Sequence, residues 1–349
     1  MSNVKVRLDD VKQIDIVNVP GGITASELKK LHPDAEVISS LTMFVLKNRL
    51  NFVRVEDENK KDGYLGGNDG IGIKNEKDLV FCTYKEAYDS KDIRDYVSGF
   101  PTLVKDGKVN IDWGNKYSSY VDGYHKRLLI GFNNHLLIIV ATNRKISLTA
   151  AAKLMIRYGC DYAINGDGGD WSPHLQRGNT ILRKGSRRNP TWLLVYMDKK
   201  RLFIEHMLEH IGKDYIFGTN GEIATPSKLK QLISWFGLSH YKNSSFDATD
   251  SANNNIQDFD CSGLMIFELR RLGVIGMTAD YTARGLFYNK CNEIERSELQ
   301  NGDLVFYNNL KHVGMYYDGK VIEARGTAYG VIITDRLDDF TKFGRIKDL

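Results

Sequence analysis

The chain has 349 residues, which is too long for one domain of ordinary size and fits two. Hydrophobic residues make up 42% of it and aromatic residues 11%, so the composition predicts packed cores and excludes intrinsic disorder. The formal net charge is +4. Residues 1–200 are basic, with 31 Lys and Arg against 24 Asp and Glu, and the remainder is acidic, with 17 against 20. We expect no nucleic-acid partner.

The first part of the chain predicts a domain of short strands with few helices. The hydrophobic patterns and turn signals predict strands over 36–44, 51–55, 79–84, 160–164 and 193–197, a glycine-rich break over 63–70 and a hairpin from 127–131 to 136–142. A helix is predicted over 147–158, because Ser147 or Thr149 can cap it, alanines fill it and Gly159 ends it.

Near residue 200 the pattern changes, and we predict two domains, 1–200 and 201–349. The linker between them is short and not enriched in Pro, Gly or Ser. In the second domain the patterns predict helices over 202–211, 227–236 and 261–272, and strands over 304–307, 313–317 and 321–324. Together the elements predict an α+β protein with a β-rich first domain.

A cysteine, a histidine and a carboxylate follow one another in an order that suits nucleophilic catalysis. Cys261 lies in the segment 260–264, Asp-Cys-Ser-Gly-Leu, where the apolar helix begins. His312 opens the segment 312–316, His-Val-Gly-Met-Tyr, and Glu323 lies on the following strand. Because a thiol nucleophile needs a base and the base needs a group that orients it, we predict Cys261 as nucleophile, His312 as base and acid, and Glu323 as the orienting carboxylate.

The surroundings of Cys261 bear on its reactivity. A helix start and a nearby imidazolium both lower the pKa of a thiol, and we expect both here. Each residue taken alone would fit a structural role as well, as a buried cysteine or a satisfied histidine. Their order, together with Gly-Asp-Leu-Val-Phe at 302–306 and Ile-Glu-Ala-Arg-Gly at 322–326, favours the chemical role. The other cysteines, Cys82, Cys160 and Cys291, are expected to be reduced and mostly buried.

These segments resemble the NlpC/P60 family of cell-wall cysteine peptidases, and the segment 322–331 resembles the versions that phage lysins carry. The resemblance implies a papain-like fold and cleavage of a peptidoglycan stem peptide, at the bond between γ-D-glutamyl and the diamino acid. It further implies that four residues bind substrate: Tyr215, Asp260, Ser262 and Arg325. More residues separate Tyr215 from Cys261 than the family usually has, and we expect an inserted flap there.

Segments of the first domain resemble the phosphodiester glycosidase family, in the same order over most of residues 35–200. They are 98–108 (Ser-Gly-Phe-Pro-Thr-Leu-Val-Lys-Asp-Gly-Lys), 125–131 (His-Lys-Arg-Leu-Leu-Ile-Gly) and 162–169 (Tyr-Ala-Ile-Asn-Gly-Asp-Gly-Gly). Hydrolysis of a sugar phosphodiester needs a cation for the phosphate and an acid or base for the leaving oxygen. We predict Arg127 for the phosphate and Asp167 for the second role, with Asn165 and Asp170 as nearby site residues.

The chain departs from the family pattern at 39–44, at 142–144 and at 170–171, where Asp-Trp replaces small residues. A domain that binds a wall glycopolymer without hydrolysing it is therefore an open alternative to an active one. For Asp167 the alternative is a purely structural role as a turn residue. The Asp-Gly-Gly-Asp turn can hold calcium, but no ladder of further ligands accompanies it, and we expect no metal and no cofactor. A basic cluster at Arg177, Arg183, Lys184, Arg187 and Arg188 fits either a polyanion site or a solvated loop.

We expect a two-domain lytic protein that acts on peptidoglycan and on a teichoic acid or related wall glycopolymer. Residues 1–10 carry no secretory signal, and no stretch approaches the roughly 18 apolar residues of a membrane span. We therefore expect synthesis in the cytoplasm, no membrane insertion, and action at the wall after host lysis or within a virion beside other phage tail proteins. The alternative is a structural or wall-binding component of a phage tail whose active sites have decayed.

Overall fold

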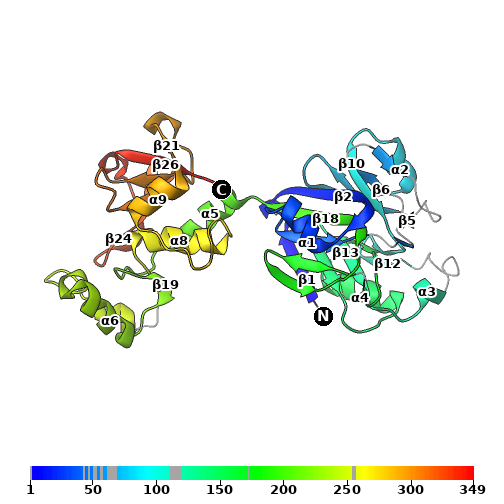
Figure 1. Ribbon diagram of the computed structural model, residues 1–349, viewed down its shortest axis with the longest axis horizontal. Coiled ribbons are helices and arrows are strands. Elements are labelled where there is room, and N and C mark those ends of the chain that lie inside the picture. Colours follow the sequence, from blue (N-terminus) through cyan, green and yellow to red (C-terminus); the bar gives the residue numbers. More distant parts are fainter. Residues whose placement is uncertain are drawn as a thin grey trace. The chain divides into compact units, whose positions relative to one another are not determined.

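The computed structural model describes residues 2–41, 44–45, 48–49, 53–55, 58–60, 69–110, 119–171, 173–253 and 257–349. It divides into two compact units, Met1–Asp198 and Lys199–Leu349, and each is described by itself (Figure 1). Both units combine helices with antiparallel sheets, so the predicted α+β class with two domains is confirmed. The predicted strand 51–55 and the predicted break 63–70 lie partly outside the described residues.

The N-terminal unit is built from sheets whose neighbouring strands run antiparallel. The first sheet has the order β1 (Ser2–Arg7), β14 (Leu136–Ala141), β13 (Leu128–Phe132), β15 (Tyr162–Asn165), β11 (Thr102–Lys105) and β12 (Lys108–Val109). The second has the order β7 (Glu58–Lys60), β6 (Val53–Val55), β10 (Ile93–Ser98), β8 (Gly70–Lys74) and β9 (Asp78–Cys82). The third has the order β17 (Thr180–Arg183), β16 (Leu175–Arg177), β3 (Val37–Ser40), β18 (Asn189–Met197) and β2 (Val11–Ile23), and β4 (Phe44–Val45) pairs with β5 (Asn48–Arg49).

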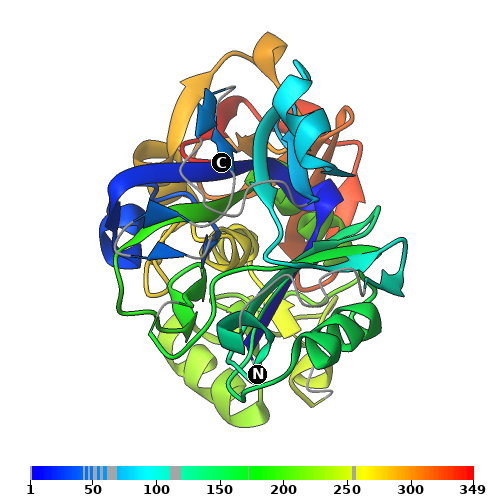
Figure 2. The ribbon, with the colours of Figure 1, turned by 90° about the vertical axis from the view of Figure 1, so that its right-hand side faces the viewer.

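The longest ladder of this unit joins β2 to β18, and the blue β2 and green β18 run side by side in Figure 2. The sequence pattern did not predict β2. Its buried residues Val11, Ile14 and Ile16 do not keep a strict alternation, and the ladder carries irregularities at both ends. A strand with bulges loses the period of two on which a prediction from hydrophobicity depends.

Side chains from these sheets meet in a shared apolar core, which includes Ile14, Val37, Ile130, Ile139 and Val195. Helix α4 (Leu148–Arg157) covers β11, β13 and β15 and buries its alanine-rich face. Ser147 caps it by accepting a hydrogen bond from the N–H of Ala150, which confirms the predicted helix.

The remaining helices of this unit are short: α1 (Ala25–Leu31), α2 (Tyr84–Asp89) and α3 (Ser119–Asp122). The predicted strand 79–84 is too long, because β9 ends at Cys82 and Thr83 begins a capping box with Glu86. The predicted strand 36–44 is likewise shorter, since β3 ends at Ser40.

The C-terminal unit contains a sheet with the order β21 (Cys291–Ile294), β26 (Lys342–Ile346), β22 (Leu304–Phe306), β23 (Val313–Tyr317), β24 (Lys320–Gly326) and β25 (Gly330–Thr334). Its helices are α5 (Lys199–Glu209), α6 (Pro226–Phe236), α7 (Thr249–Asn253), α8 (Cys261–Arg271) and α9 (Ala283–Lys290), and β19 (Asn220–Ile223) pairs with β20 (Gln257–Phe259). The three predicted helices and three predicted strands of this unit are confirmed to within a few residues. Helix α8 packs against α5 and against β23 and β24 (Figure 1), and these contacts form the core of the unit.

The expected insertion between Tyr215 and Cys261 is a folded element. Thr225 caps α6, and Pro226 occupies its first turn. The insertion has a small core of its own: Ile216, Ala224, Leu229, Leu232, Tyr241, Ala248 and Ala252. Within the described part of the chain, no helix is long and apolar enough to cross a membrane.

Candidate active site

Cys261 is the first residue of α8, and Asp260 caps that helix. One carboxylate oxygen of Asp260 accepts a hydrogen bond from the N–H of Gly263 at 2.6 Å, and the other accepts from the N–H of Gly218 at 3.0 Å. Position 263 requires glycine, since a Cβ there would lie 2.0 Å from the carbonyl oxygen of Thr219. The segment Asp-Cys-Ser-Gly therefore places the cysteine at a helix start that is fixed by the cap of Asp260 and by close contact with Thr219.

The half-buried thiol of Cys261 lies against the backbone on both sides of His312. Its Sγ is 4.0 Å from the carbonyl oxygen of Lys311, and the N–H of Val313 also contacts it. Burial raises the pKa of Cys261 to about 12, and the charge of Asp260 adds to that rise. The expectation of a lowered pKa is therefore wrong for this resting state, because desolvation and a neighbouring carboxylate outweigh the helix start.

His312 and Glu323 are joined by a short hydrogen bond. Nε2 of His312 lies 2.6 Å from Oε2 of Glu323, and the Glu323 side chain is fully buried. The antiparallel pairing of β23 with β24 brings the two residues together. Gly314 allows the two strands to pack this closely, since a Cβ there would lie 2.4 Å from Cγ1 of Val321 and 3.3 Å from Cβ of Glu323. With Nε2 engaged, Nδ1 is the ring nitrogen that is left for the thiol.

Two further residues hold the buried carboxylate, and the sequence analysis missed both. The hydroxyl of Thr334 donates to Oε1 of Glu323 at 2.7 Å, and a guanidinium nitrogen of Arg336 lies 3.8 Å from the same oxygen. Burial raises the pKa of Glu323, but the hydrogen bonds from His312 and Thr334 outweigh it and leave the pKa lowered. The carboxylate is thus kept charged and oriented toward the imidazole. No motif marks Thr334, because only strand pairing brings it close.

The four predicted substrate-binding residues make different contacts. Tyr215 is half-buried, and burial raises the pKa of its hydroxyl, to which the charges of Cys261 and Asp260 add. The hydroxyl of Ser262 donates to the carboxylate of Asp260 at 3.1 Å. Arg325 lies on β24, with its guanidinium 4.1 Å above the ring of Tyr329. Asp260 and Ser262 therefore have structural partners in this state, and their contact with substrate stays a prediction.

The insertion is tied to the cap of α8 and to the turn after β24. Besides the hydrogen bond from Gly218 to Asp260, Thr327 donates to the carbonyl oxygen of His240 at 3.4 Å. Tyr241 is buried and donates to the carbonyl oxygen of Phe217 at 3.0 Å. The insertion is therefore attached at the cap beside the thiol as well as at the turn after β24.

In the N-terminal unit the structure brings Arg127 and Asn165 together but buries both. A guanidinium nitrogen of Arg127 donates to Asn165 at 3.3 Å, and the others donate to the carbonyl oxygens of Ile146, Val121 and Gly123 at 2.7 to 3.0 Å. Burial lowers the pKa of Arg127 to about 10. The guanidinium is thus engaged by the protein itself, and its role toward a phosphate stays a prediction.

The turn after β15 carries the two predicted aspartates. Asp167 is buried, with its N–H 3.2 Å from the carbonyl oxygen of Leu41, whereas Asp170 is half exposed and lies 2.5 Å from the amine of Lys126. The hydrogen bond from Lys126 lowers the pKa of Asp170. Lys126 was not predicted for this site, although it directly precedes Arg127 in the motif.

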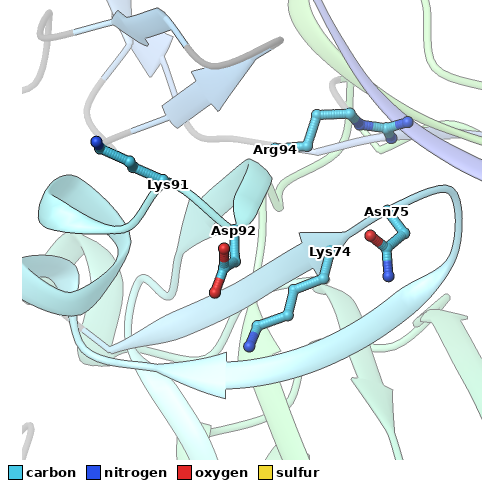
Figure 3. A pocket seen from close by; sticks show the side chains of 5 residues that line it. All are labelled: Lys74, Asn75, Lys91, Asp92 and Arg94. Carbon is cyan, nitrogen blue, oxygen red and sulfur yellow. The ribbon is translucent and has the colours of Figure 1, made fainter.

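A polar pocket lies elsewhere in the N-terminal unit, at the β8–β9 turn and the start of β10. It measures about 480 Å³ and is lined by Lys74, Asn75, Lys91, Asp92 and Arg94 (Figure 3). It contains none of the predicted site residues. Arg94 donates to the carboxylates of Asp15 and Asp95 at 2.9 and 2.8 Å, so acidic groups of the protein already neutralise it.

Among the described residues, no group of three His, Cys, Asp or Glu side chains is placed to hold a metal ion. The four cysteines are free thiols.

Two family models match the chain. The phosphodiester glycosidase model matches residues 17–196, and the NlpC/P60 model matches residues 247–342. Among curated proteins, the murein DD-endopeptidase MepH of Escherichia coli (strain K12) is 36% identical over 89 residues, which are 24% of this chain and 32% of that protein. The chain therefore spans about a third of the length of this relative.

Two solved structures resemble the two units. The catalytic domain of zebrafish N-acetylglucosamine-1-phosphodiester alpha-N-acetylglucosaminidase, auto-inhibited by its pro-peptide, is 16% identical, with 53% of this chain and 73% of that chain covered and a TM-score of 0.45. The P60 domain of an antigen from M. avium subspecies paratuberculosis is 26% identical, with 42% of this chain and 94% of that chain covered and a TM-score of 0.27.

Proposed function

Because the chain belongs to the phosphodiester glycosidase family through its N-terminal unit and carries a C-terminal NlpC/P60 domain, we propose that it is a wall-degrading enzyme with a separate wall ligand for each unit. The NlpC/P60 match and the murein endopeptidase relative support a peptidoglycan hydrolase. In our proposal the C-terminal unit cleaves a stem peptide by thiol chemistry, and the N-terminal unit hydrolyses or binds a phosphodiester-linked wall sugar.

The observation that carries the proposal is the bond of 2.6 Å between His312 and the buried Glu323, with the thiol of Cys261 against the backbone at 311–313. A carboxylate buried without water is costly unless it is paired, and here a histidine is its partner. The arrangement supplies a nucleophile, a base and an orienting group from three separate elements.

In the first step, Sγ of Cys261 attacks the carbonyl carbon of the amide, and its proton passes to Nδ1 of His312. Since the pKa of Cys261 is raised to about 12 at rest, we propose that the proton leaves as the sulfur attacks. Glu323 stabilises the imidazolium that forms, and in our proposal the N–H of Cys261 at the start of α8 donates to the oxyanion, since the N–H of Gly263 is engaged by Asp260.

In the second step, the imidazolium gives its proton to the leaving amine, the C–N bond breaks and a thioester remains on Cys261. Water then attacks the thioester, His312 takes a proton from this water, and the peptide leaves as a carboxylic acid while the thiol is restored. The products are one new amine and one new carboxylate for each bond cleaved.

The bond itself has two candidates. The resemblance of the motifs implies the bond between γ-D-glutamyl and the diamino acid, whereas the relative MepH is described as a DD-endopeptidase, which points to a cross-link. We favour the first bond. Mass spectrometry of fragments from digested walls distinguishes them, because the first cut leaves glutamate at the new carboxyl terminus and a cut in the cross-link does not.

The experiment for the C-terminal unit measures amine release from purified cell walls. The parent should release amines, and a thiol-blocking reagent or Cys261→Ser should reduce the rate at least about 10³-fold. Cys82→Ser is the matched control, because this half-buried thiol lies in the other unit. If no wall type yields amines that depend on Cys261, the structural or wall-binding alternative gains.

For the N-terminal unit we propose that Asp167 serves the leaving oxygen of the phosphodiester. Asp167→Ala should then abolish sugar release from a phosphodiester model compound and keep binding of the polymer. Equal release by variant and parent would remove Asp167 from the mechanism. If the parent releases no sugar but binds the polymer, the unit is a binding module.

We also propose that the protein reaches the wall from a phage or prophage context, through host lysis or as part of a particle. The resemblance of 322–331 to phage lysins supports this source. Mass spectrometry of purified virions from a lysogen that encodes the chain would detect it in the particle case and miss it in the lysis case.

A further inference from the structure

The turn after β15 carries an exposed aromatic residue beside several cations. Trp171 is 64% exposed, directly after Asp170, where the family resemblance predicts small residues. Its carbonyl oxygen accepts a hydrogen bond from the N–H of Ser186 at 2.9 Å, so the loop 184–188 is attached to this turn. A single exposed aromatic residue is ordinary on a protein surface, so Trp171 bears on binding only together with the cations beside it.

Arg183, which ends β17, differs from Arg127 in how its guanidinium is engaged. One Nη of Arg183 donates to the carbonyl oxygen of Asp170 at 3.3 Å. Its Nε is shielded from solvent and has no hydrogen-bond partner in the described part of the chain. A guanidinium has five N–H donors, and an unused donor away from water is costly unless a ligand takes it. Arg127, by contrast, donates to Ile146, Asn165, Val121 and Gly123.

A second cation lies at the same turn. The amine of Lys126 contacts the carboxylate of Asp170 at 2.5 Å, with Lys126 26% and Asp170 52% exposed. The charges of Lys145 and Arg183 also act on Asp170, since they contribute to its lowered pKa after the larger effect of Lys126. A partly exposed ion pair contributes modestly to stability, so Lys126 can turn from Asp170 to a ligand at modest cost.

We propose that Arg183, Lys126 and Trp171 form a binding subsite for an anionic glycopolymer whose sugars are linked by phosphodiesters. The fork of Arg183 takes the phosphate oxygens, Lys126 adds charge, and the indole of Trp171 covers the apolar face of a sugar. This inference rests on the proposed function of the N-terminal unit and deepens it, because it places phosphate recognition on Arg183 in place of the buried Arg127.

The test is calorimetric titration of the full chain with poly(N-acetylglucosamine 1-phosphate). Arg183→Gln should weaken binding about tenfold or more, as expected for the loss of a charge-assisted hydrogen bond. Arg187→Gln, on the neighbouring loop 184–188 and exposed, is the matched control and should change affinity less than about twofold. Arg183→Lys should fall between them, because it keeps the charge and loses the fork.

A second pair of probes separates the sugar from the phosphate. Trp171→Ala should weaken binding of the sugar polymer and leave binding of unsubstituted polyglycerol phosphate unchanged, whereas Arg183→Gln should weaken both. Neutral chitin oligosaccharide should bind parent and Arg183→Gln alike.

Four outcomes count against the inference. Equal losses from Arg183→Gln and Arg187→Gln would mean diffuse attraction to a basic surface, and no loss from Arg183→Gln would remove the subsite. A parent that binds neither phosphate polymer would overturn both the subsite and the proposed function of this unit, so the two failures are distinguishable. If Arg183→Gln lowers the thermal unfolding midpoint, Lys126→Gln replaces it as the variant, and an unchanged affinity then counts against the subsite.

Discussion

The two units show opposite ways in which a buried ionisable group is satisfied. In the C-terminal unit, the buried Glu323 is bonded to His312, a group that itself can take and give a proton. In the N-terminal unit, the buried Arg127 is bonded to an amide oxygen and to backbone carbonyl oxygens, none of which titrates. Both residues lie in motifs that resemble catalytic families.

A motif therefore identifies a residue but not the state of its donors and acceptors. The carboxylate of Glu323 orients its neighbour for proton transfer, because it is bonded to Nε2 of His312 and leaves Nδ1 for the thiol. The guanidinium of Arg127 stabilises loops around it and has few donors left. The following predictions test this contrast.

The largest effect is expected for Arg127, if its role is structural. Arg127→Lys should lower the free energy of unfolding of the N-terminal unit by about 3 kcal/mol, because a lysine cannot reach several carbonyl oxygens at once and leaves some unpaired. Urea unfolding of the full chain, followed by circular dichroism, measures this loss. The exposed Arg144→Lys is the matched control and should be neutral. A stable Arg127→Lys variant that has lost polymer binding would instead place Arg127 in the ligand site.

Removal of the charge of Glu323 should come next. Glu323→Gln keeps a side chain of the same size but no longer stabilises the imidazolium, and amine release should fall about 100-fold. The turnover number should fall more than the Michaelis constant rises, because the charge acts on the transition state. An activity within about threefold of the parent would show that Glu323 only fills the core.

A third prediction concerns Glu268, a second buried carboxylate that is bonded to histidines. Glu268 has no predicted catalytic role, so it serves as a structural reference for Glu323. Glu268 on α8 is fully buried, 2.7 Å from both His206 and His210, with Arg271 at 3.4 Å. Burial raises its pKa, but the hydrogen bond from His210 and the nearby cations outweigh this and lower it. A lowered pKa stabilises the fold above the unfolded value of about 4.3, and the contribution is lost as pH falls through the folded pKa.

Glu268→Gln should therefore cost about 2 kcal/mol of unfolding free energy at pH 7, and the gap to the parent should shrink below about pH 4. Urea midpoints measured from pH 7 down to pH 3 check both statements. Glu209→Gln, an exposed carboxylate at the end of α5, serves as control. A gap that stays constant over this range would mean that packing, not charge, connects Glu268 to its neighbours.

The smallest effect is expected at the cap of α8. Asp260 raises the pKa of Cys261 after the larger effect of burial. Asp260→Asn keeps an oxygen for the N–H of Gly263 and removes the charge, so the pKa of the thiol should fall and alkylation by iodoacetamide at pH 8 should quicken about three- to tenfold. Rates over a pH series with mass detection at Cys261 measure the shift, and an unchanged profile would contradict the electrostatic explanation.

The amino-acid sequence by itself determined the features that depend on neighbours along the chain. Helix α4 follows from Ser147, a run of alanines and Gly159, and α8 follows from Asp260 and an apolar period, because caps and periodicity act over a few residues. The strands around His312 and Glu323 and the α+β class were determined in the same way.

Only the tertiary structure decided the features that depend on partners distant in the sequence. Glu323 on β24 contacts Thr334, at the end of β25, and Arg336, which follows that strand. In the N-terminal unit, Arg127 bonds to Asn165, which is 38 residues away in the sequence. The pKa of Cys261 depends on how deeply its thiol is buried, and the neighbouring residues in the sequence do not predict that burial. The physical reason is that desolvation and hydrogen-bond satisfaction are properties of the folded interior, where strand pairing and packing bring distant groups into contact.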